Sequence, residues 1–569
     1  FILIDPISIS FSQLCLKKSN LLISTRNSLS SLSSSSQQSS QQPLIYDMTS
    51  ALAEYIRSRI NIINNNNINN NNNKEEFINQ SVLGAVEVLS RVCSDMDYTL
   101  RIQQLLHLGS SLLELMQSVV SLLVHTLSLS SPSRDSTATV LCTERMNTEI
   151  TSVVYVLKGL EYIIQYSEGR NRPNETPSVI QSDQSLLTIS TSWQAFLRSI
   201  WTQTRSLESF LGETCSVTDR RVDTDTGVGR TSTSLEMKIA PVSPALSAMW
   251  KSVFGFYNTI MLYIPELARS EMTDICHSIQ LAASLPDSSV AIGALQCSGC
   301  LVELLSSLSS SDASNGTTTC LSESNVSTLT QLIEMITQIT SQRLDRMVPY
   351  NNTTLDPEYI EQYFGLIQRY LQLCPQVLVT WSGLPLLPRL AVSCLAPVSS
   401  GVDSPVSGAG TGSSSDWGST RAVLAVLQTL FFAVEPRQSP YQTVFFKSVL
   451  PVGDKAVQRI LSGIMGGMTV LTLLQPHFAD SFYYIISGCE NSNYLDGCRI
   501  WIQNALADPN TCPSARLPVE YHDLITQTAF RLAISENRRK FKVFIQDLTK
   551  VCLLEMDVES LLSYTISIQ

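Results

Sequence analysis

The residues best suited to chemistry are two cysteines at metal-binding or redox spacing, Cys297 and Cys300. A structural zinc site needs four soft ligands, so a second Cys-x-x-Cys or a histidine pair at short spacing has to supply the other two. The nearest additional thiols, Cys276 and Cys320, stand singly, and no strand pattern gives the context of a thioredoxin-type dithiol. We therefore expect the Cys-x-x-Cys to be structural, and we predict no metal, no cofactor and no catalytic residue.

Two other short motifs suggest catalysis when each is taken alone, but their sequence context does not support it. Residues 225–227 read Asp-Thr-Gly, as in aspartic proteases, but that chemistry needs two carboxylates that share a proton. The glycine-rich run at residues 408–412 could cradle a phosphate, yet no strand precedes it and no lysine follows it. Both runs lie in polar stretches, so we expect loops there and a protein that is not an enzyme.

Carboxylates on helices are the remaining functional candidates. Glu358 and Glu361 lie three residues apart in a strongly amphipathic stretch, so a helix would place them on one face. Two neighbouring carboxylates can hold arginine side chains through paired hydrogen bonds. We predict Glu358 and Glu361 as partner-binding residues. Asp480, Glu490 and Asp496 are candidates of the same kind.

The basic run at residues 538–542 allows two interpretations. Arg-Arg-Lys-x-Lys could act as a nuclear localisation signal. We favour the exposed face of a helix, because Phe541, Phe544, Ile545 and Leu548 recur at helical spacing and would form its buried face.

The elements that must position these residues are helices. From residue 77 onward apolar residues recur every three or four positions, and no period-two alternation predicts a strand. The helices come in pairs at a spacing close to the ~40–47 residues of HEAT-type repeats. The sequence thus predicts an all-α HEAT-repeat solenoid over residues 77–554. Within it we expect residues 100–127 to form two helices that are broken near Gly109.

Polar stretches divide this pattern. Residues 1–76 contain a Ser/Gln tract and an asparagine tract, which bury too little apolar surface to offset backbone entropy, so we predict a disordered segment there. Between the tracts, apolar residues recur at helical spacing over residues 51–60, as in the remnant of an interrupted helix or a solvated segment. Residues 555–569 are expected to form a C-terminal tail. Solenoids tolerate long outward loops, and we expect four polar inserts, near residues 168–185, 212–241, 309–324 and 397–417.

Composition excludes several partners. Of the 569 residues 15% are charged, and the net charge is −11, so the chain lacks the basic surface that nucleic acid requires. The 14 cysteines lie mostly singly along the chain, as reduced structural thiols do. No uninterrupted apolar run of ~18 residues spans a bilayer, and the first residues lack the basic start of a signal peptide. We expect a soluble intracellular protein without a membrane or nucleic-acid partner. An acidic chain favours basic protein partners.

Residues 369–375 read Arg-Tyr-Leu-Gln-Leu-Cys-Pro, a turn at the end of an amphipathic helical pattern. With this turn, the C-terminal third resembles the β-karyopherin nuclear transport receptors of the transportin-SR and importin-thirteen branch. The matching blocks follow in the same order and with similar spacing: residues 357–378, 384–391, 477–486, 499–506 and 538–548.

The resemblance implies a receptor that carries protein cargo, including Ser/Arg-rich proteins, between cytoplasm and nucleus. Its partners would be the cargo and Phe-Gly nucleoporins, and Glu358 and Glu361 would contact the cargo. The family grips Ran-GTP mainly through N-terminal repeats that have no counterpart here, and the chain begins with Phe1 rather than Met, so we expect a fragment that binds Ran-GTP poorly. The alternative is a HEAT/armadillo-like scaffold subunit for complex assembly without a transport role.

Overall fold

The computed structural model of the chain consists of helices. It describes residues 46–58, 72–94, 98–129, 136–167, 184–219, 243–285, 287–307, 321–347, 356–395, 414–433, 438–465, 471–509, 511, 517–535 and 537–566. Within these ranges every regular element is an α-helix or a short 3-10 helix, and no strand occurs among them. The all-α prediction is confirmed. The chain divides into two compact units, residues 1–293 and 294–569.

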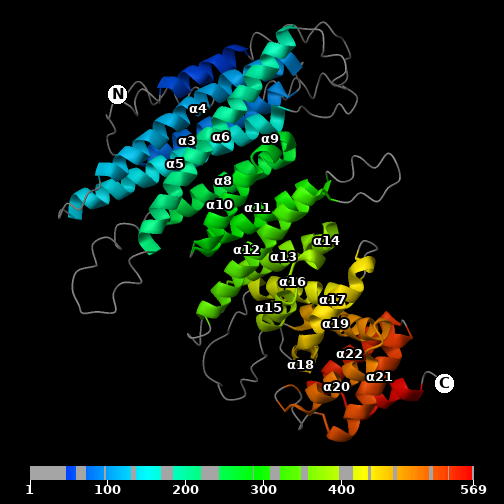
Figure 1. Cartoon of the computed structure of the whole chain (residues 1–569). Helices are drawn as coiled ribbons and strands as arrows, with labels where there is room; N and C mark the ends of the chain where they lie inside the picture. Colours follow the sequence, from blue (N-terminus) through cyan, green and yellow to red (C-terminus); the bar gives the residue numbers. More distant parts are fainter. Residues whose placement is uncertain are drawn as a thin grey trace, which may run out of the picture. The chain divides into compact units, whose positions relative to one another are not determined.

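Unit 1 is built from long helices in two layers. After a helix over residues 46–58, its elements are α3 (Asn72–Cys93), α4 (Tyr98–Leu129), α5 (Ser136–Ser167), α6 (Gln184–Asp219), α8 (Ser243–Tyr263), α9 (Pro265–Ser270) and α10 (Met272–Ser284). Helices α3, α5 and α8 pack in succession, and α4, α6 and α10 form a second succession (Figure 1). Contacts between α4 and α5 join the two layers.

Unit 2 repeats this stacking with shorter helices. Helix α11 (Ser288–Ser307) crosses the division between the units. The elements that follow are α12 (Glu323–Met347), α13 (Pro357–Leu373), α14 (Pro375–Thr380), α15 (Leu386–Cys394), α16 (Ser414–Phe431), η3 (Ser439–Tyr441), α17 (Gln442–Val449), η4 (Leu450–Val452), α18 (Gly453–Met465), α19 (Leu471–Asn491), α20 (Leu495–Ala507), η5 (Val519–Tyr521), α21 (His522–Ile534), α22 (Arg538–Cys552), η6 (Val558–Leu562) and α23 (Ser563–Ile566).

The two layers of unit 2 follow chain order. Helices α13, α16, α19 and α22 pack each on the next, and α15, α18 and α20 form the second succession. Within each repeat one layer contacts the other, as α18 does α19 and α21 does α22. Each helix pair thus packs mainly on the pairs beside it in sequence, which is the organisation of a helical-repeat solenoid.

Helix α4 is continuous where we expected a break near Gly109. A Cβ atom at Gly109 would lie 2.3 Å from the ring of Phe196 on α6. The glycine therefore serves close packing of α6 on α4, and a helix interior tolerates one glycine at a cost of about 1 kcal/mol. The prediction of two separate helices was wrong.

The helix over residues 46–58 corrects part of the disordered segment predicted for residues 1–76. Leu52, Ala53 and Ile56 are fully buried, and the Thr49 hydroxyl donates a hydrogen bond to the side chain of Gln104 on α4. Burial of this apolar stripe stabilises the helix despite the polar tracts on both sides. Helix α3 also begins earlier than expected, at Asn72. The rest of the 1–76 segment lies outside the described residues.

The four polar inserts are shorter than predicted at several ends. Helix α6 begins at Gln184 and runs to Asp219, α12 begins at Glu323, and α16 begins at Ser414. Residues 321 and 322 precede α12 without regular structure, and the remaining parts of the inserts lie outside the described residues. These ends carry Ser, Thr, Asn and Asp, which have weak helix propensity, so the sequence pattern understates the length of each helix.

The predicted C-terminal tail is packed on unit 2 as far as Tyr564. The Tyr564 ring contacts Phe544 at a centroid distance of 5.4 Å. The Tyr564 hydroxyl donates a hydrogen bond to Asp547, and its carbonyl accepts one from Arg531. Residues 558–566 are thus a structural end to the last repeat rather than a free tail.

Two helices are long and apolar enough to cross a membrane by length and composition alone, Leu100–Val124 in α4 and Ser288–Ser307 in α11. Half of the residues in the first apolar window and 72% of those in the second are buried inside the protein. Packing against neighbouring helices accounts for the apolar character of both.

Candidate functional site

Helix α13 carries the two predicted site residues, and local capping interactions stabilise its N-terminus. Asp356 caps the helix, since its carboxylate accepts a hydrogen bond from the backbone N–H of Glu358 at 3.0 Å. Pro357 occupies the first turn, where the missing N–H costs nothing. The acidic side chain of Glu358 also lies at the positive end of the helix dipole, which stabilises it there.

Buried tyrosines fix α13 against α12. The hydrogen bonds are Tyr359 Oη to Thr340 Oγ1 (2.9 Å), Tyr363 Oη to Thr337 Oγ1 (3.1 Å) and Tyr370 Oη to the Leu329 carbonyl (3.0 Å). All three rings are fully buried. Because this face is held in the core, the opposite face of α13 has a defined orientation toward solvent.

The structure places Glu358 and Glu361 together on that exposed face. Neither carboxylate forms an ion pair with a residue that the structure describes. The Glu361 carboxylate lies against the backbone of α16 at Gly418, where a Cβ atom would come within 2.9 Å of Oε1. Both carboxylates are accessible to a partner, and α16 restricts the position of one of them.

The Cys-x-x-Cys of α11 is packed rather than open. Cys297 is fully buried, and the Arg369 guanidinium covers Gly299 between the two cysteines. Arg369 also pairs with Glu303, Nε to Oε1 at 3.3 Å. Burial, and secondarily the Glu303 carboxylate, raise the pKa of the Cys300 thiol. Among the described residues no three His, Cys, Asp or Glu side chains gather as metal ligands would.

A different pair of cysteines meets in space, and no motif marks it. Cys489 near the end of α19 and Cys498 in α20 are both fully buried. A hydrogen bond between the two thiols, followed by burial, raises the pKa of Cys498 well above its usual range. The cysteines among the described residues are free thiols. Sequence analysis missed this pair because its members are nine positions apart on two helices that a turn joins.

Asp480 is not available to a partner, which corrects its place among the candidates. Its carboxylate accepts Arg538 Nε at 2.8 Å on one oxygen and Lys542 Nζ at 2.8 Å on the other. The Arg538 guanidinium lies 5.1 Å from the Tyr484 ring centre. Two members of the basic run thus join α22 to α19. The apolar face predicted for α22 is confirmed, since Phe541, Phe544, Ile545 and Leu548 are buried.

Replacing Asp480 with asparagine should destabilise unit 2 by about 1–2 kcal/mol. The change leaves two cations facing each other beside a largely buried site, although partial exposure of Arg538 and Lys542 reduces the cost below that of a fully buried pair. Thermal unfolding followed by circular dichroism measures it. The matched control is Glu303→Gln, at the exposed unit 2 pair with Arg369, which should change stability by less than about 0.5 kcal/mol. Equal losses of stability in the Asp480 variant and in the control would contradict a structural role for the Asp480 ion pairs.

Unit 1 holds a buried charged network that sequence analysis also missed. Glu208 on α6 is buried and accepts hydrogen bonds from Tyr257 Oη, from Ser278 Oγ at 2.8 Å and from Arg205 Nη1 at 2.7 Å. Burial raises the pKa of Glu208, and these hydrogen bonds oppose the shift. Arg205 also reaches Asp274 at 3.4 Å. The network joins α6, α8 and α10, so its role is to fix helix positions.

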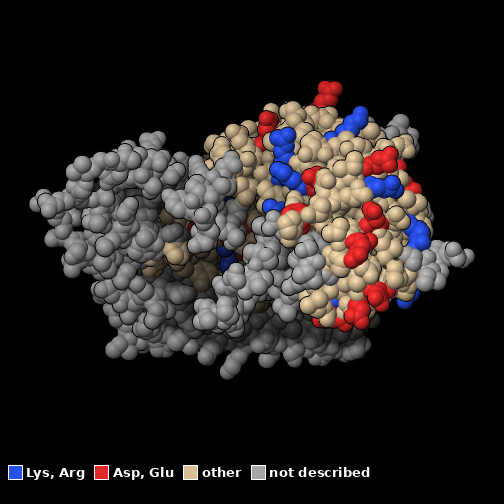
Figure 2. All heavy atoms as spheres, turned by 90° about the horizontal axis from the view of Figure 1, so that it is seen from below, with Lys and Arg blue, Asp and Glu red and all other residues tan. Residues whose placement is uncertain are grey.

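The other candidates have simpler placements. Asp496 is exposed and Glu490 half-buried, and neither forms an ion pair within the described residues. Residues 225–227 and 408–412 lie outside the described residues. On the face drawn in Figure 2, acidic and basic side chains of the described residues alternate over short distances rather than forming one field of a single sign.

No protein-family model and no curated protein sequence matches the chain. Ten chains of solved structures do match. One is described as importin 13 in its cytosolic state, with a TM-score of 0.40 and 13% sequence identity. The match covers 96% of this chain and 64% of that chain, so this protein spans somewhat under two thirds of the importin 13 chain.

Proposed function

We propose that this chain is a karyopherin-like transport receptor that binds protein cargo. In this proposal it moves cargo between cytoplasm and nucleus, and the cargo includes Ser/Arg-rich proteins that contact Glu358 and Glu361. Its function is binding rather than catalysis.

The stacked helix layers of unit 2 carry the proposal. Each pair contacts mainly the pairs beside it, and such arrays present extended surfaces that can hold a long or folded partner. The blocks at residues 357–378, 477–486 and 538–548, which resemble transport receptors, coincide with α13–α14, part of α19 and part of α22. Helices α13, α19 and α22 belong to one packed layer, and the other two blocks, residues 384–391 and 499–506, overlap α15 and α20 of the second layer.

Charge supports a basic cargo. The chain carries a net charge of −11, and Glu358 and Glu361 form an exposed pair of carboxylates on a helix that three tyrosines hold in place. A guanidinium can bind such carboxylates bidentately, and a rigid backbone lowers the entropic cost of doing so.

Reversing both charges, Glu358→Lys with Glu361→Lys, should weaken binding of an Arg/Ser-repeat peptide by about tenfold or more. Two attractive contacts become repulsive, and ~1.4 kcal/mol corresponds to a tenfold change. Binding should also weaken as salt rises, because exposed charge pairs are screened beyond ~8 Å at physiological ionic strength. Fluorescence anisotropy at two salt concentrations measures both effects.

The matched control is Glu555→Lys with Glu559→Lys, which makes the same charge change at exposed positions after α22. This control should retain most of the affinity. Equal loss in both double variants would show attraction to net charge alone and would refute a site on α13.

The alternative, a HEAT/armadillo-like scaffold without a transport role, differs in its partners. A receptor should bind Phe-Gly repeats of nucleoporins weakly and with little salt dependence, whereas a scaffold should ignore them. Ran-GTP should bind poorly, because the resemblance to transport receptors covers their middle and C-terminal repeats. A pull-down in which Ran-GTP binds tightly while Arg-rich cargo and Phe-Gly repeats do not would overturn the proposal.

A further inference from the structure

Helices α20 and α21 present an apolar surface that the core of unit 2 does not use. Ile500 on α20 is 55% exposed and Val519 on η5 is 72% exposed, although their neighbours Trp501 and Leu517 are buried. Single exposed apolar residues are ordinary. These two side chains, however, lie on adjacent elements of one surface.

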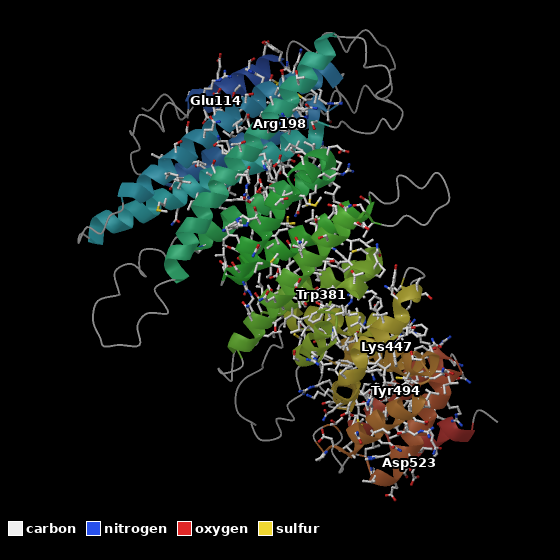
Figure 3. All side chains as sticks on the ribbon, in the orientation of Figure 1. Glu114, Arg198, Trp381, Lys447, Tyr494 and Asp523 are labelled. Carbon is white, nitrogen blue, oxygen red and sulfur yellow. The ribbon has the colours of Figure 1, made fainter. Side chains whose placement is uncertain are left out.

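A hydrogen bond between α20 and α21 lies between the two positions. Gln503 Nε2 on α20 donates to Asp523 Oδ1 on α21 at 3.3 Å. Ile500 lies one turn before Gln503 and Val519 one turn before Asp523, so the two apolar side chains flank this bond. We call Ile500, Val519 and the carboxylates described next the α20–α21 surface. Figure 3 labels Asp523 near the end of unit 2.

Exposed carboxylates lie within four residues of each apolar side chain along the sequence. Asp496, Glu520 and Asp523 are exposed, and among the described residues none of them forms an ion pair. The nearby cation, Arg499, lies over the Phe530 ring at 5.7 Å. Each carboxylate is close to a helix N-terminus, which favours its charge. The surface therefore combines exposed apolar area with excess negative charge.

We propose that the α20–α21 surface docks a protein segment in which basic side chains alternate with large apolar ones. The apolar residues of the segment would cover Ile500 and Val519, and its lysines or arginines would pair with the surrounding carboxylates. This inference does not depend on a transport role, and it concerns a surface other than the α13 carboxylates.

Complementary chemistry selects this partner over others. Covering two exposed branched side chains gives a favourable hydrophobic term, and opposite charges around them set orientation and partner choice. Nucleic acids and anionic membranes are repelled by three carboxylates. Trp501 and Ile502 are buried beside Ile500 and hold the α20 backbone in place, so docking needs little rearrangement.

The test uses the full chain and a fluorescent 12-residue peptide that alternates arginine with leucine. Ile500→Ser with Val519→Ser should raise the Kd of this peptide about tenfold, equivalent to about 1.4 kcal/mol. Asp496→Asn with Asp523→Asn should raise it by a similar factor at low salt and by much less at high salt. Replacing leucine by serine, or arginine by glutamate, in the peptide should abolish most binding.

The matched control is Leu386→Ser with Val444→Ser, two other partly exposed apolar residues of unit 2. These changes should leave the Kd of the peptide unchanged, and thermal melts should show that all variants fold. An unchanged Kd in the Ile500/Val519 variant, or an equal loss in the control, would overturn the proposal. Binding of the wild-type chain to phosphatidylserine vesicles that the Ile500/Val519 variant loses would point to a membrane and overturn it too.

Discussion

Gly488→Ala should destabilise unit 2 by about 3 kcal/mol. A Cβ atom at Gly488 on α19 would lie 2.2 Å from the carbonyl oxygen of Phe431 on α16 and 2.9 Å from its carbon. These are backbone atoms, so relief requires α16 and α19 to move apart, and overpacking of this kind costs about 1–3 kcal/mol or more. The same carbonyl accepts a hydrogen bond from Gln442 Nε2 at 2.7 Å, which the displacement would strain. A lowered midpoint of urea or thermal unfolding of unit 2 measures the effect.

Gly365→Ala is the matched control, because Gly365 also lies within a unit 2 helix but has no heavy atom within 4 Å of its potential Cβ. Helix propensity then favours alanine, and the variant should be more stable by about 0.5–1 kcal/mol. The two Gly→Ala changes should therefore shift stability in opposite directions. An unchanged midpoint for Gly488→Ala would mean that α16 and α19 do not approach as closely as the structure shows.

Helix existence was predictable from the sequence because apolar periodicity and burial have the same cause. The stripe that identified α13 contains Ile360, Tyr363, Phe364, Ile367 and Leu371, of which the last four are buried and Ile360 is half-buried. The buried face of α22 was predicted on the same ground. Periodicity reports which face of a helix leaves water, so it predicts strongly amphipathic helices well.

The ends of helices were less predictable where a helix continues into polar sequence, or where a short helix lies between two polar tracts. Helix α6 extends into two expected inserts, and the helix over residues 46–58 lies between two low-complexity tracts. Tertiary packing stabilises both, since Thr49 contacts Gln104 and Phe196 packs at Gly109. Contacts between residues far apart in sequence leave no local signal. The predicted helix break at Gly109 was wrong for the same reason, because this glycine is required by the packing of Phe196 from α6 and not by a turn in α4.

The solvent exposure of the candidate carboxylates was predictable from the sequence, but their ion-pair partners on other helices were not. A helical wheel correctly places Glu358 and Glu361 on one exposed face. It cannot show that Asp480 meets Arg538 and Lys542 from another helix, so sequence analysis placed the acid among candidate sites and the cations on a solvated face. Which charges face solvent depends on contacts between neighbouring repeats, and single-sequence patterns do not contain them.

Glu161→Gln should stabilise unit 1 by up to about 3 kcal/mol at pH 8 and by almost nothing at pH 4.5. Glu161 on α5 lies against the backbone of Gly255 on α8, where a Cβ atom would come within 2.9 Å of Oε1. Burial raises the pKa of this carboxyl to about 7 from its usual 4.5, and Lys158 opposes the shift only in part. A shift of ~2.5 units corresponds to about 3 kcal/mol.

The direction of the pH dependence follows from which form the folded state prefers. With a folded pKa above the unfolded one, the protonated carboxyl is favoured in the folded protein, so stability from this group is full below about pH 4.5 and is lost as pH rises through about 7. The nearest titratable neighbour of this carboxyl along its own helix is Tyr162, whose pKa is raised by burial, by its hydrogen bond with Glu87 on α3 and by the charge of Glu161. Glutamine keeps the shape and stays neutral at every pH, so the variant should lose this pH dependence.

Thermal unfolding of both proteins between pH 4.5 and 8 measures this pH dependence, with Glu54→Gln at an exposed position as the control. A stability difference between wild type and Glu161→Gln that does not change with pH would show that the α5–α8 contact does not bury this carboxyl.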